Sequence, residues 1–180
     1  RGRAAPPRRR QEISRRAMAA PSAAGPIRDL PSLLRGMEPE LAEEGDVVFV
    51  ASQLGMREAA ALDPWMMFRE DEALTLILPR AQAEAQGFGH DGAMRRITLR
   101  VHSALDAVGL TAAVAACLTE ANISANVVAA YHHDHVYVPS ADAGRAVAAL
   151  RGLSEAAAGG AAGGVGAGEP PCKRDTGAEA

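Results

Sequence analysis

Hydrophobic and polar residues alternate most regularly within residues 95–153. Ile97, Leu99 and Val101 are separated by polar residues, which is the spacing of a strand with one buried face. Residues 110–121 then place apolar side chains three and four positions apart, and this spacing predicts an amphipathic helix. The region therefore begins with a strand followed by a helix.

Two further strands and a helix complete this region. Alternation returns in residues 123–129 and again in residues 136–138. Pro139 ends the last strand, because proline cannot donate to a strand ladder. An Ala-rich helix follows, with Val147 and Leu150 on its inward face. The predicted order is strand, helix, strand, strand, helix.

Residues 27–92 carry a weaker pattern of the same kind. The predicted elements are a leucine-rich helix, an acidic connector, a strand, an irregular stretch, an edge strand, a second strand and a short helix. They fall in turn at residues 30–37, 38–44, 47–50, 52–64, 65–68, 74–78 and 80–86. This half of the chain resembles the other in its pattern of elements more than in sequence identity.

An internal repeat follows from two strands that each end at a proline and lead into a helix. They are residues 74–78 before Pro79 and residues 136–138 before Pro139. We match the helix at 30–37 with the helix at 110–121, so a helix–strand–strand–helix unit is predicted twice. No strand-like run follows the last helix. Either the N-terminal half completes the sheet, or its edge is left for another copy. We predict one interlocked α+β body.

Composition narrows the class of protein. Of 180 residues, 48% are hydrophobic and 3% aromatic, so the core consists mainly of Ala, Val and Leu. No apolar run approaches the ~20 residues of a membrane-spanning helix, and no membrane or nucleic-acid partner is predicted. Cys117 and Cys172 show neither a pairing pattern nor metal-ligand spacing, which suits a reducing, cytoplasmic compartment.

The ends of the chain differ from its middle. Seven arginines and one acid lie in residues 1–16, so the remainder, which brings the net charge to −3, carries an excess of nine acids. An acidic body is a poor partner for phosphate. Residues 1–26 are interpreted as a disordered basic arm, an upstream segment before Met18, or an organelle transit segment. The Ala/Gly-rich residues 154–180 are predicted to be disordered.

The junction between the first strand and its helix holds the most informative residues. Gly109 allows close backbone approach, and the free N–H groups of a helix start favour an anionic group. Ser103 and Asp106 are three residues apart, the spacing of a capping box. The alternative is that Ser103 and Asp106 only cap the helix, while Gly109 only eases packing.

Other polar groups have plain interpretations. Alternation puts six side chains on the outward face of the sheet: Arg96, Thr98, Arg100, Asn126, His135 and Tyr137. That face is solvated, contacts another copy, or binds RNA, although RNA needs stacking aromatics and only Tyr137 qualifies. The histidines of residues 132–135 form a polar turn instead of a metal site, because neighbouring strand residues point to opposite faces. Cys117 is a small buried hydrophobe. No catalytic constellation or cofactor motif occurs.

Residues 95–153 resemble an ACT domain, a small-molecule-sensing βαββαβ module. Asp106-Ala-Val-Gly109-Leu110 is similar to the usual Asp-Arg-Pro-Gly-Leu, and Glu120-Ala-Asn-Ile123-Ser to Glu-Ala-Gly-Ile-Asn. The run from Val101 to Pro139 is similar to small, stand-alone, uncharacterised ACT proteins with a Tyr-x-His-Asp-His turn. The likeness extends over residues 28–153 and implies a ferredoxin-like sandwich. Residues 27–92 are then an N-terminal ACT-like half, and residues 93–153 an ACT domain.

The resemblance also implies a ligand-binding site where the first strand meets its helix. Carried over to this chain, it consists of His102, Ser103, Asp106, Val108, Gly109, Leu110 and, on the neighbouring strand, Asn126. Val108 replaces the proline that ACT sequences usually have there. The implied ligand is an amino acid or a relative of one, and the implied assembly is a homo-oligomer. ACT domains usually regulate an attached enzyme, which this chain does not contain, so a partner enzyme is implied.

Two functions therefore remain open. The first is a non-enzymatic regulator that binds an amino acid at the junction. The second is an interaction or oligomerisation module that binds no small ligand. A metal-dependent activity at the histidine turn is a distant third.

Overall fold

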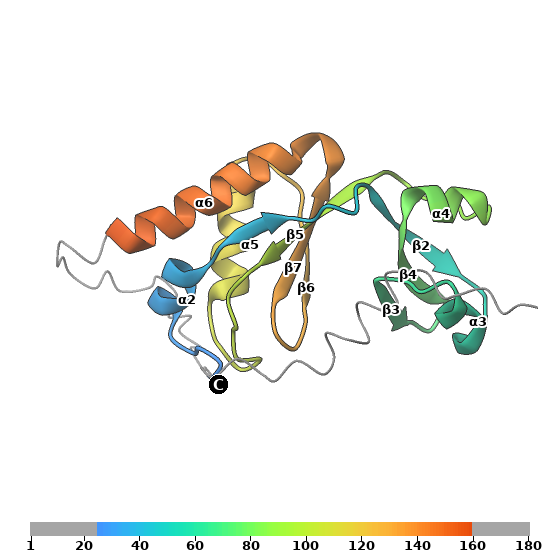
Figure 1. Cartoon of the computed structure of the whole chain (residues 1–180), viewed down its shortest axis with the longest axis horizontal. Coiled ribbons are helices and arrows are strands. Elements are labelled where there is room, and N and C mark those ends of the chain that lie inside the picture. The colour runs from blue at the N-terminus through green and yellow to red at the C-terminus, as the bar shows by residue number, and fades with distance from the viewer. Residues whose placement is uncertain (1–24, 160–180) are drawn as a thin grey trace, which may run out of the picture.

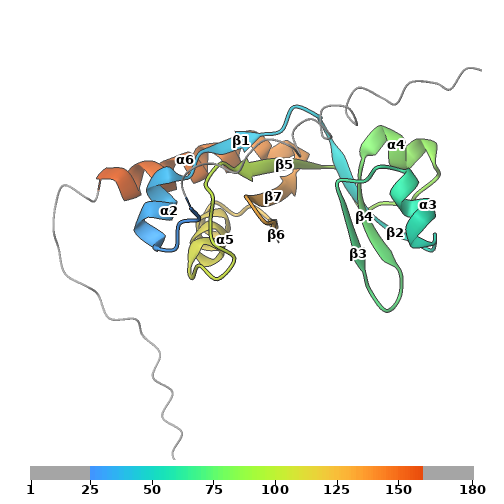
Figure 2. The same cartoon turned by 60° about the horizontal axis from the view of Figure 1, so that its bottom comes forward.

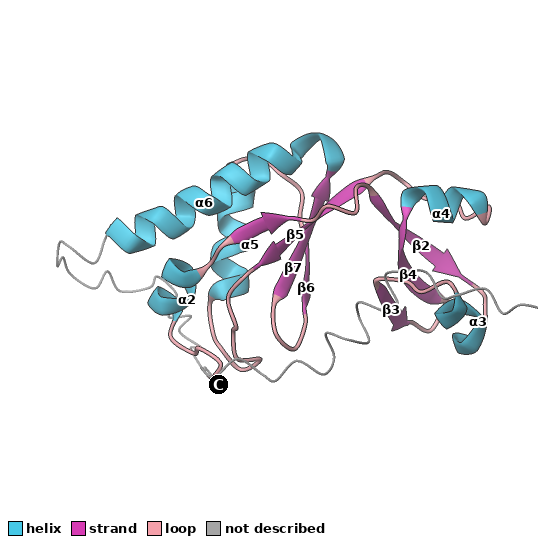
Figure 3. Cartoon of the chain, in the orientation of Figure 1, coloured by secondary structure: helices cyan, strands magenta, loops and turns pink. Residues whose placement is uncertain are grey.

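The computed structural model describes residues 25–159 (Figures 1 and 3). The predictions made for residues 1–24 and 160–180 lie outside that range. In chain order, the elements are α2 (Leu30–Gly36), β1 (Pro39–Leu41), β2 (Val47–Ser52), α3 (Met56–Ala61), β3 (Met66–Arg69), β4 (Leu74–Pro79), α4 (Arg80–Ala85), β5 (Met94–Leu99), α5 (Leu110–Glu120), β6 (Asn126–Ala129), β7 (Asp134–Pro139), a 3₁₀ turn (Ser140–Asp142) and α6 (Ala143–Gly159).

The molecule consists of two halves that meet where β2 and β5 touch (Figure 1). In one half α2, α5 and α6 cover one face of the sheet, and in the other half α3 and α4 do so (Figures 1 and 2). Each half combines antiparallel strands with helices on one side, which is a ferredoxin-like α+β arrangement. The predicted fold class is confirmed.

The sheet of the C-terminal half includes a strand from the N-terminal segment of the chain, β1. The sheet order is β3-β4-β2-β5-β7-β6, with β1 also paired to β5. β1 runs antiparallel to β5 from Pro39 opposite Leu99 to Leu41 opposite Ile97, and so fills the place that a strand after α6 would take. The N-terminal segment thus completes the sheet, and the edge beside β5 is not left for another copy. The prediction of one interlocked body is confirmed.

The internal repeat is real, but its predicted alignment was wrong at one helix. Val47 pairs with Pro79 as Met94 pairs with Pro139. The repeating unit is therefore β2-α3-β3-β4-α4, followed by β5-α5-β6-β7-α6. In this repeat, the helix equivalent to α5 is the short helix α3, not α2. The prediction treated residues 52–64 as irregular because α3 carries only one buried side chain, Ala59, and so has little apolar periodicity.

Two other segments differ from the prediction. The acidic connector at residues 38–44 contains β1, whose charged Glu40 is exposed while Pro39 is buried. The last helix, predicted to end near Leu153, continues to Gly159. The Ala-rich residues 154–159 extend α6 because alanine favours the helix even where little surface is buried.

The core of the C-terminal half includes side chains from the start of the described chain. Leu33 and Met37 are 0% and 1% exposed and pack with Ile97, Val114 and Leu150. Leu33 lies within α2, which begins at the Asp29 cap, where the carboxylate accepts from the N–H of Ser32 (2.9 Å). Residues 30–41 therefore pack on the C-terminal half although they precede the N-terminal one.

The outward sheet face is not simply solvated, as its alternation had suggested. Thr98 is 5% and Tyr137 2% exposed. Phe49 of the other half meets Tyr137 edge-on, with 5.3 Å between ring centroids. The guanidinium of Arg96 lies 3.9 Å from the centre of the Trp65 ring. The halves cover part of each other's open face, which alternation along one strand does not reveal.

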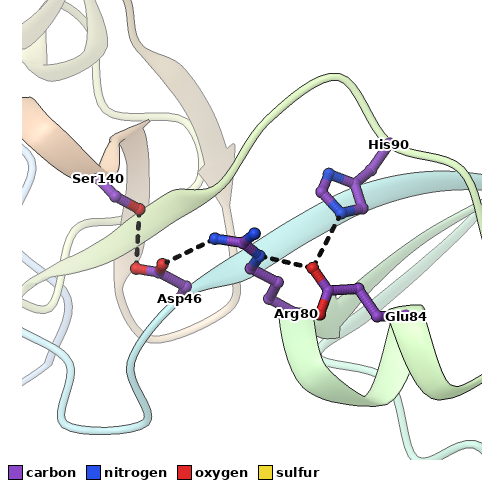
Figure 4. Close-up of polar contacts among 5 residues, drawn as sticks. All are labelled: Asp46, Arg80, Glu84, His90 and Ser140. Carbon is purple, nitrogen blue, oxygen red and sulfur yellow. Dashed lines mark hydrogen bonds and ion pairs between the residues drawn. The ribbon is translucent and has the colours of Figure 1, made fainter.

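A polar network also joins the halves at their meeting point (Figure 4). The Ser140 hydroxyl donates to Asp46 (2.8 Å), and Arg80 lies 3.9 Å from the other oxygen of that carboxylate. Arg80 also donates to Glu84 (2.8 Å), which lies 3.7 Å from His90. The Asp46 side chain thus bridges the two short segments that follow Pro79 and Pro139.

Candidate functional site

The loop between β5 and α5 gathers most of the predicted site. Gly109 is the N-cap of α5 and has a left-handed backbone, with φ of +105°. Leu110 is buried, whereas Val108 is 83% exposed. His102, Ser103 and Asp106 lie on the same loop. Six of the seven predicted residues therefore lie together, between the end of β5 and the first turn of α5.

The chain itself occupies the inner side of this loop. The N–H of Ile27 donates to the carbonyl of His102 (2.8 Å), and the N–H of Ala104 donates to the carbonyl of Ile27 (2.9 Å). A Cβ added to Gly109 would lie 2.9 Å from a methyl group of Leu30. The close approach that Gly109 permits is thus made by Leu30. Asp106 and Val108 lie on the exposed side of the same loop.

Asp106 has a cationic partner. Its carboxylate forms an ion pair with Arg28, and both side chains are 66% exposed. The hydrogen bond from Arg28 holds the pKa of Asp106 below its ordinary value, so the group is ionised at neutral pH. An exposed pair of this kind exchanges readily with another cation, because it stabilises little in water.

The predicted capping box is wrong. The N-cap of α5 is Gly109, without a side-chain hydrogen bond, and Ser103 points elsewhere. Its hydroxyl donates to Asp134 (3.4 Å), and both residues are buried. Burial raises the pKa of Asp134, although the Ser103 hydrogen bond lowers it in part. Ser103 thus holds the loop against the start of β7, instead of capping the helix.

Aromatic and imidazole rings gather beside this loop. His102 and His132 have ring centroids 5.3 Å apart, and Tyr131, 72% exposed, stands edge-on to His132 at 4.9 Å. His133 contacts the carbonyl of Val101 (3.2 Å). Within residues 25–159, no group of three or more His, Cys, Asp or Glu side chains is arranged to hold a metal ion.

Asn126 lies away from the other predicted residues. It pairs with Tyr137, which pairs with Arg96 near the start of β5, whereas the loop follows the end of β5. The length of β5 separates them by roughly 15 Å. The Asn126 amide makes one long contact, to the sulfur of Met94 (3.8 Å). The structure therefore does not bring Asn126 to the junction.

Asn126 instead lines a cavity of about 420 Å³. Phe49, Met94 and Pro139 form its apolar side, and Asp91 and the backbone of residues 92–93 complete it. The sequence pattern did not identify Phe49, Asp91 or Met94 as site residues. Phe49 belongs to the other half, and only the antiparallel contact of β2 with β5 brings it to Asn126.

His135 is a partly buried imidazole on the same sheet face. Its Nδ1 lies 3.0 Å from the Thr98 hydroxyl. Burial, together with the positive charges of Arg96, His133 and Arg100, lowers the pKa of His135 to about 4. The ring is therefore neutral at physiological pH.

Sequence and structure comparisons agree with this fold. Residues 25–95 match one profile described as an ACT domain, and residues 95–152 match a second. A Vibrio cholerae protein of unknown function, described as a possible transport protein, is 43% identical with a TM-score of 0.64. The match covers 69% of this chain and 95% of that one. No curated protein gives a significant match.

Two more distant structures are also similar. The Agrobacterium tumefaciens protein Atu0741 is 18% identical, with a TM-score of 0.53, over 66% of this chain and 89% of its own, and this likeness concerns the fold alone. The regulatory subunit of aspartate kinase from Thermus thermophilus is 9% identical, with a TM-score of 0.48, over 64% of this chain and 95% of its own. That last likeness carries no functional conclusion.

Proposed function

Because this chain belongs to the ACT domain family, we propose that it is a non-enzymatic regulator that binds an amino acid. The match of residues 25–152 to ACT domains carries the proposal, since such domains have a regulatory role. The chain would act on itself or on a partner enzyme. Within residues 25–159, no helix is long and apolar enough to cross a membrane. A cytoplasmic location stays a prediction.

The ligand is assigned to the loop between β5 and α5. The exposed Asp106 carboxylate supports this assignment, because an ammonium group can replace the Arg28 guanidinium there. His102 and Val108 belong to the same loop, and the Asp106 side chain is 66% exposed. Ser103, Gly109 and Leu110 act by fixing the loop: Ser103 through Asp134, Gly109 by admitting Leu30, and Leu110 from within the core.

A thermal-shift screen of the full chain against the twenty amino acids tests the proposal. A ligand that binds only the folded state adds about 2.7 kcal/mol at a hundredfold excess over its Kd, which raises the melting temperature measurably. Asp106→Asn should abolish the shift, and Arg28→Ala should strengthen it by freeing the carboxylate. Asp71→Asn, an exposed acid in the turn between β3 and β4, is the matched control.

The second candidate is an assembly module. Its support is the edge strand β3, whose Phe68 is 61% exposed. An exposed edge with an apolar side chain pairs readily with a second copy. Light scattering after gel filtration should then show a stable oligomer, dissociated by Phe68→Lys and unaffected by every amino acid. A monomer that responds to one amino acid would exclude this candidate.

A further inference from the structure

The two halves are related by an approximate two-fold axis at the contact of β2 with β5. Val47 pairs with Met94. Around that pair the N–H of Arg80 donates to the carbonyl of Asp46 (3.0 Å), and the N–H of Ser140 donates in the same way to Ala93 (3.1 Å). The strand positions of one half therefore have equivalents in the other, and the two open sheet faces can be compared position by position.

On the N-terminal side, the space beside the start of β3 is filled by the protein. The Trp65 ring lies against the Arg96 guanidinium (3.9 Å), and Arg96 pairs with Glu44 (2.5 Å). The Arg96 and Glu44 side chains are only 15% and 21% exposed. An indole ring, a cation and a carboxylate thus form a packed group next to Met66.

On the C-terminal side the equivalent group is incomplete. Counting from the paired positions, Phe49 replaces Arg96, Asp91 replaces Glu44, Asn126 replaces Met66 and Ala125 replaces Trp65. Ala125 is small and packs toward the helix side of the sheet. The 420 Å³ cavity lies in this place, lined by Phe49, Asp91, Met94 and Asn126. The lining has no equivalent of the Trp65 ring or of the Arg96 cation.

The groups around the cavity suit a ligand that carries an aromatic ring and a cationic group. The Phe49 ring is held edge-on against buried Tyr137 (5.3 Å, 86°) and offers a face for stacking. Asp91 is exposed, and within residues 25–159 its carboxylate has no hydrogen bond or ion pair. Among residues 25–159, the Asn126 amide makes one long contact, with the Met94 sulfur (3.8 Å), so it can donate to an anion. The volume also suits a small ligand, since such pockets measure roughly 300–1,000 Å³.

We propose that this cavity binds an aromatic α-amino acid. The ring packs on Phe49 and Met94, where the other half has Trp65 on Arg96. The ammonium pairs with Asp91, and the carboxylate accepts from the Asn126 amide. This inference rests on the proposed amino-acid-binding function and adds a second site to it, on the open sheet face and at the opposite end of β5 from the α5 junction.

Isothermal titration calorimetry on the full chain tests this site with L-phenylalanine. L-leucine tests the need for a ring, and 3-phenylpropionate the need for an ammonium group. Asp91→Asn should weaken L-phenylalanine binding by about tenfold, because it removes a charged partner, and Asn126→Ala by several-fold. Both residues are exposed, so neither change disturbs the core. Glu44→Gln, at the position equivalent to Asp91, is the matched control and should leave affinity unchanged.

The results test the cavity site and the proposed amino-acid-binding function separately. Binding of L-phenylalanine that Asp91→Asn and Asn126→Ala both weaken, with L-leucine and 3-phenylpropionate bound about tenfold less tightly, supports the cavity. If neither substitution changes binding but Asp106→Asn abolishes it, the cavity is not the binding site and the proposed function still holds. If L-leucine or 3-phenylpropionate binds as tightly as L-phenylalanine, the chemistry proposed here is wrong. If none of the twenty amino acids binds, both proposals fail.

Discussion

The two halves follow the same order of strands and helices but differ in what stabilises them. The C-terminal half packs the eleven residues of α5 and the seventeen of α6 on its sheet, together with α2. The N-terminal half has two helices of six residues each, α3 and α4, which are too short to be stable alone. Its core holds a smaller set of buried side chains, among them Val48, Leu76 and Leu78.

This difference shows that the same order of elements can form a half with a large core and a half with a smaller one. The larger C-terminal core recruits α2 and β1 from the start of the described chain, and so becomes the main source of stability. The N-terminal half joins it where Val47 of β2 pairs with Met94 of β5, and where Trp65 and Phe49 pack on the sheet face of the C-terminal half. Four predictions test this interpretation.

The largest effect is expected from Leu33→Ala in α2. Leu33 is fully buried in the C-terminal core, so the substitution should cost about 3 kcal/mol of unfolding free energy. Urea unfolding followed by circular dichroism measures it. Leu54→Ala, a partly exposed leucine before α3, is the control and should cost well under about 1 kcal/mol. Equal costs would mean that α2 does not contribute to the main core.

A matched pair of glycines compares the halves next. Gly109 and Gly87 both have positive φ, +105° and +75°, but only at Gly109 would a Cβ meet a neighbour, Leu30. Gly87→Ala should cost about 1 kcal/mol from backbone strain, and Gly109→Ala about 2 kcal/mol because the clash is added. Thermal unfolding of both variants gives the difference. Similar losses would show that Leu30 moves aside easily.

The pH dependence of stability should come partly from His135. Its folded pKa of about 4 lies below the ordinary value of 6.5, so the unfolded state binds a proton first. The stabilisation is complete above pH 6.5 and is lost as pH falls toward 4. Allowing for partial solvation, the loss is about 1–2 kcal/mol.

His135→Thr should remove that loss, because threonine is the residue at the equivalent position in β4, Thr75. Urea unfolding of both proteins at pH 7, 5.5 and 4.5 measures the difference. An unchanged slope in the variant would show that other groups cause the acid sensitivity.

The smallest effect is expected at the polar network between the halves. Ser140→Ala removes the hydroxyl that donates to Asp46 (2.8 Å) and should cost about 1 kcal/mol. Ser124→Ala, at an exposed position, is the control and should change stability by less than about 0.5 kcal/mol. A loss above 3 kcal/mol would mean that the network, and not the shared strands, holds the halves together.

The candidate site shows what pattern reading can and cannot reach. The loop of His102, Ser103, Asp106, Val108, Gly109 and Leu110 is continuous in sequence, so its residues were found together. Asn126 was assigned to the same site by resemblance, and the β6–β7 register places it elsewhere. The pattern did not single out Phe49 and Asp91, which line the cavity beside Asn126, because they come from different halves and carry no local signal. Ser103 was given a capping role because its buried acceptor, Asp134, is distant in sequence.

The sequence by itself determined the α+β class, the long helices and their buried faces, and the two strands that end at Pro79 and Pro139. These features depend on local periodicity and on backbone chemistry, and a stretch of a few residues is enough to show both. Only the tertiary structure decided that β1 completes the C-terminal sheet, that Leu30 fills the space at Gly109, and that Phe49 faces Asn126. Those contacts join segments far apart in the chain. They depend on which apolar surfaces remain uncovered once the strands and helices of both halves have packed together.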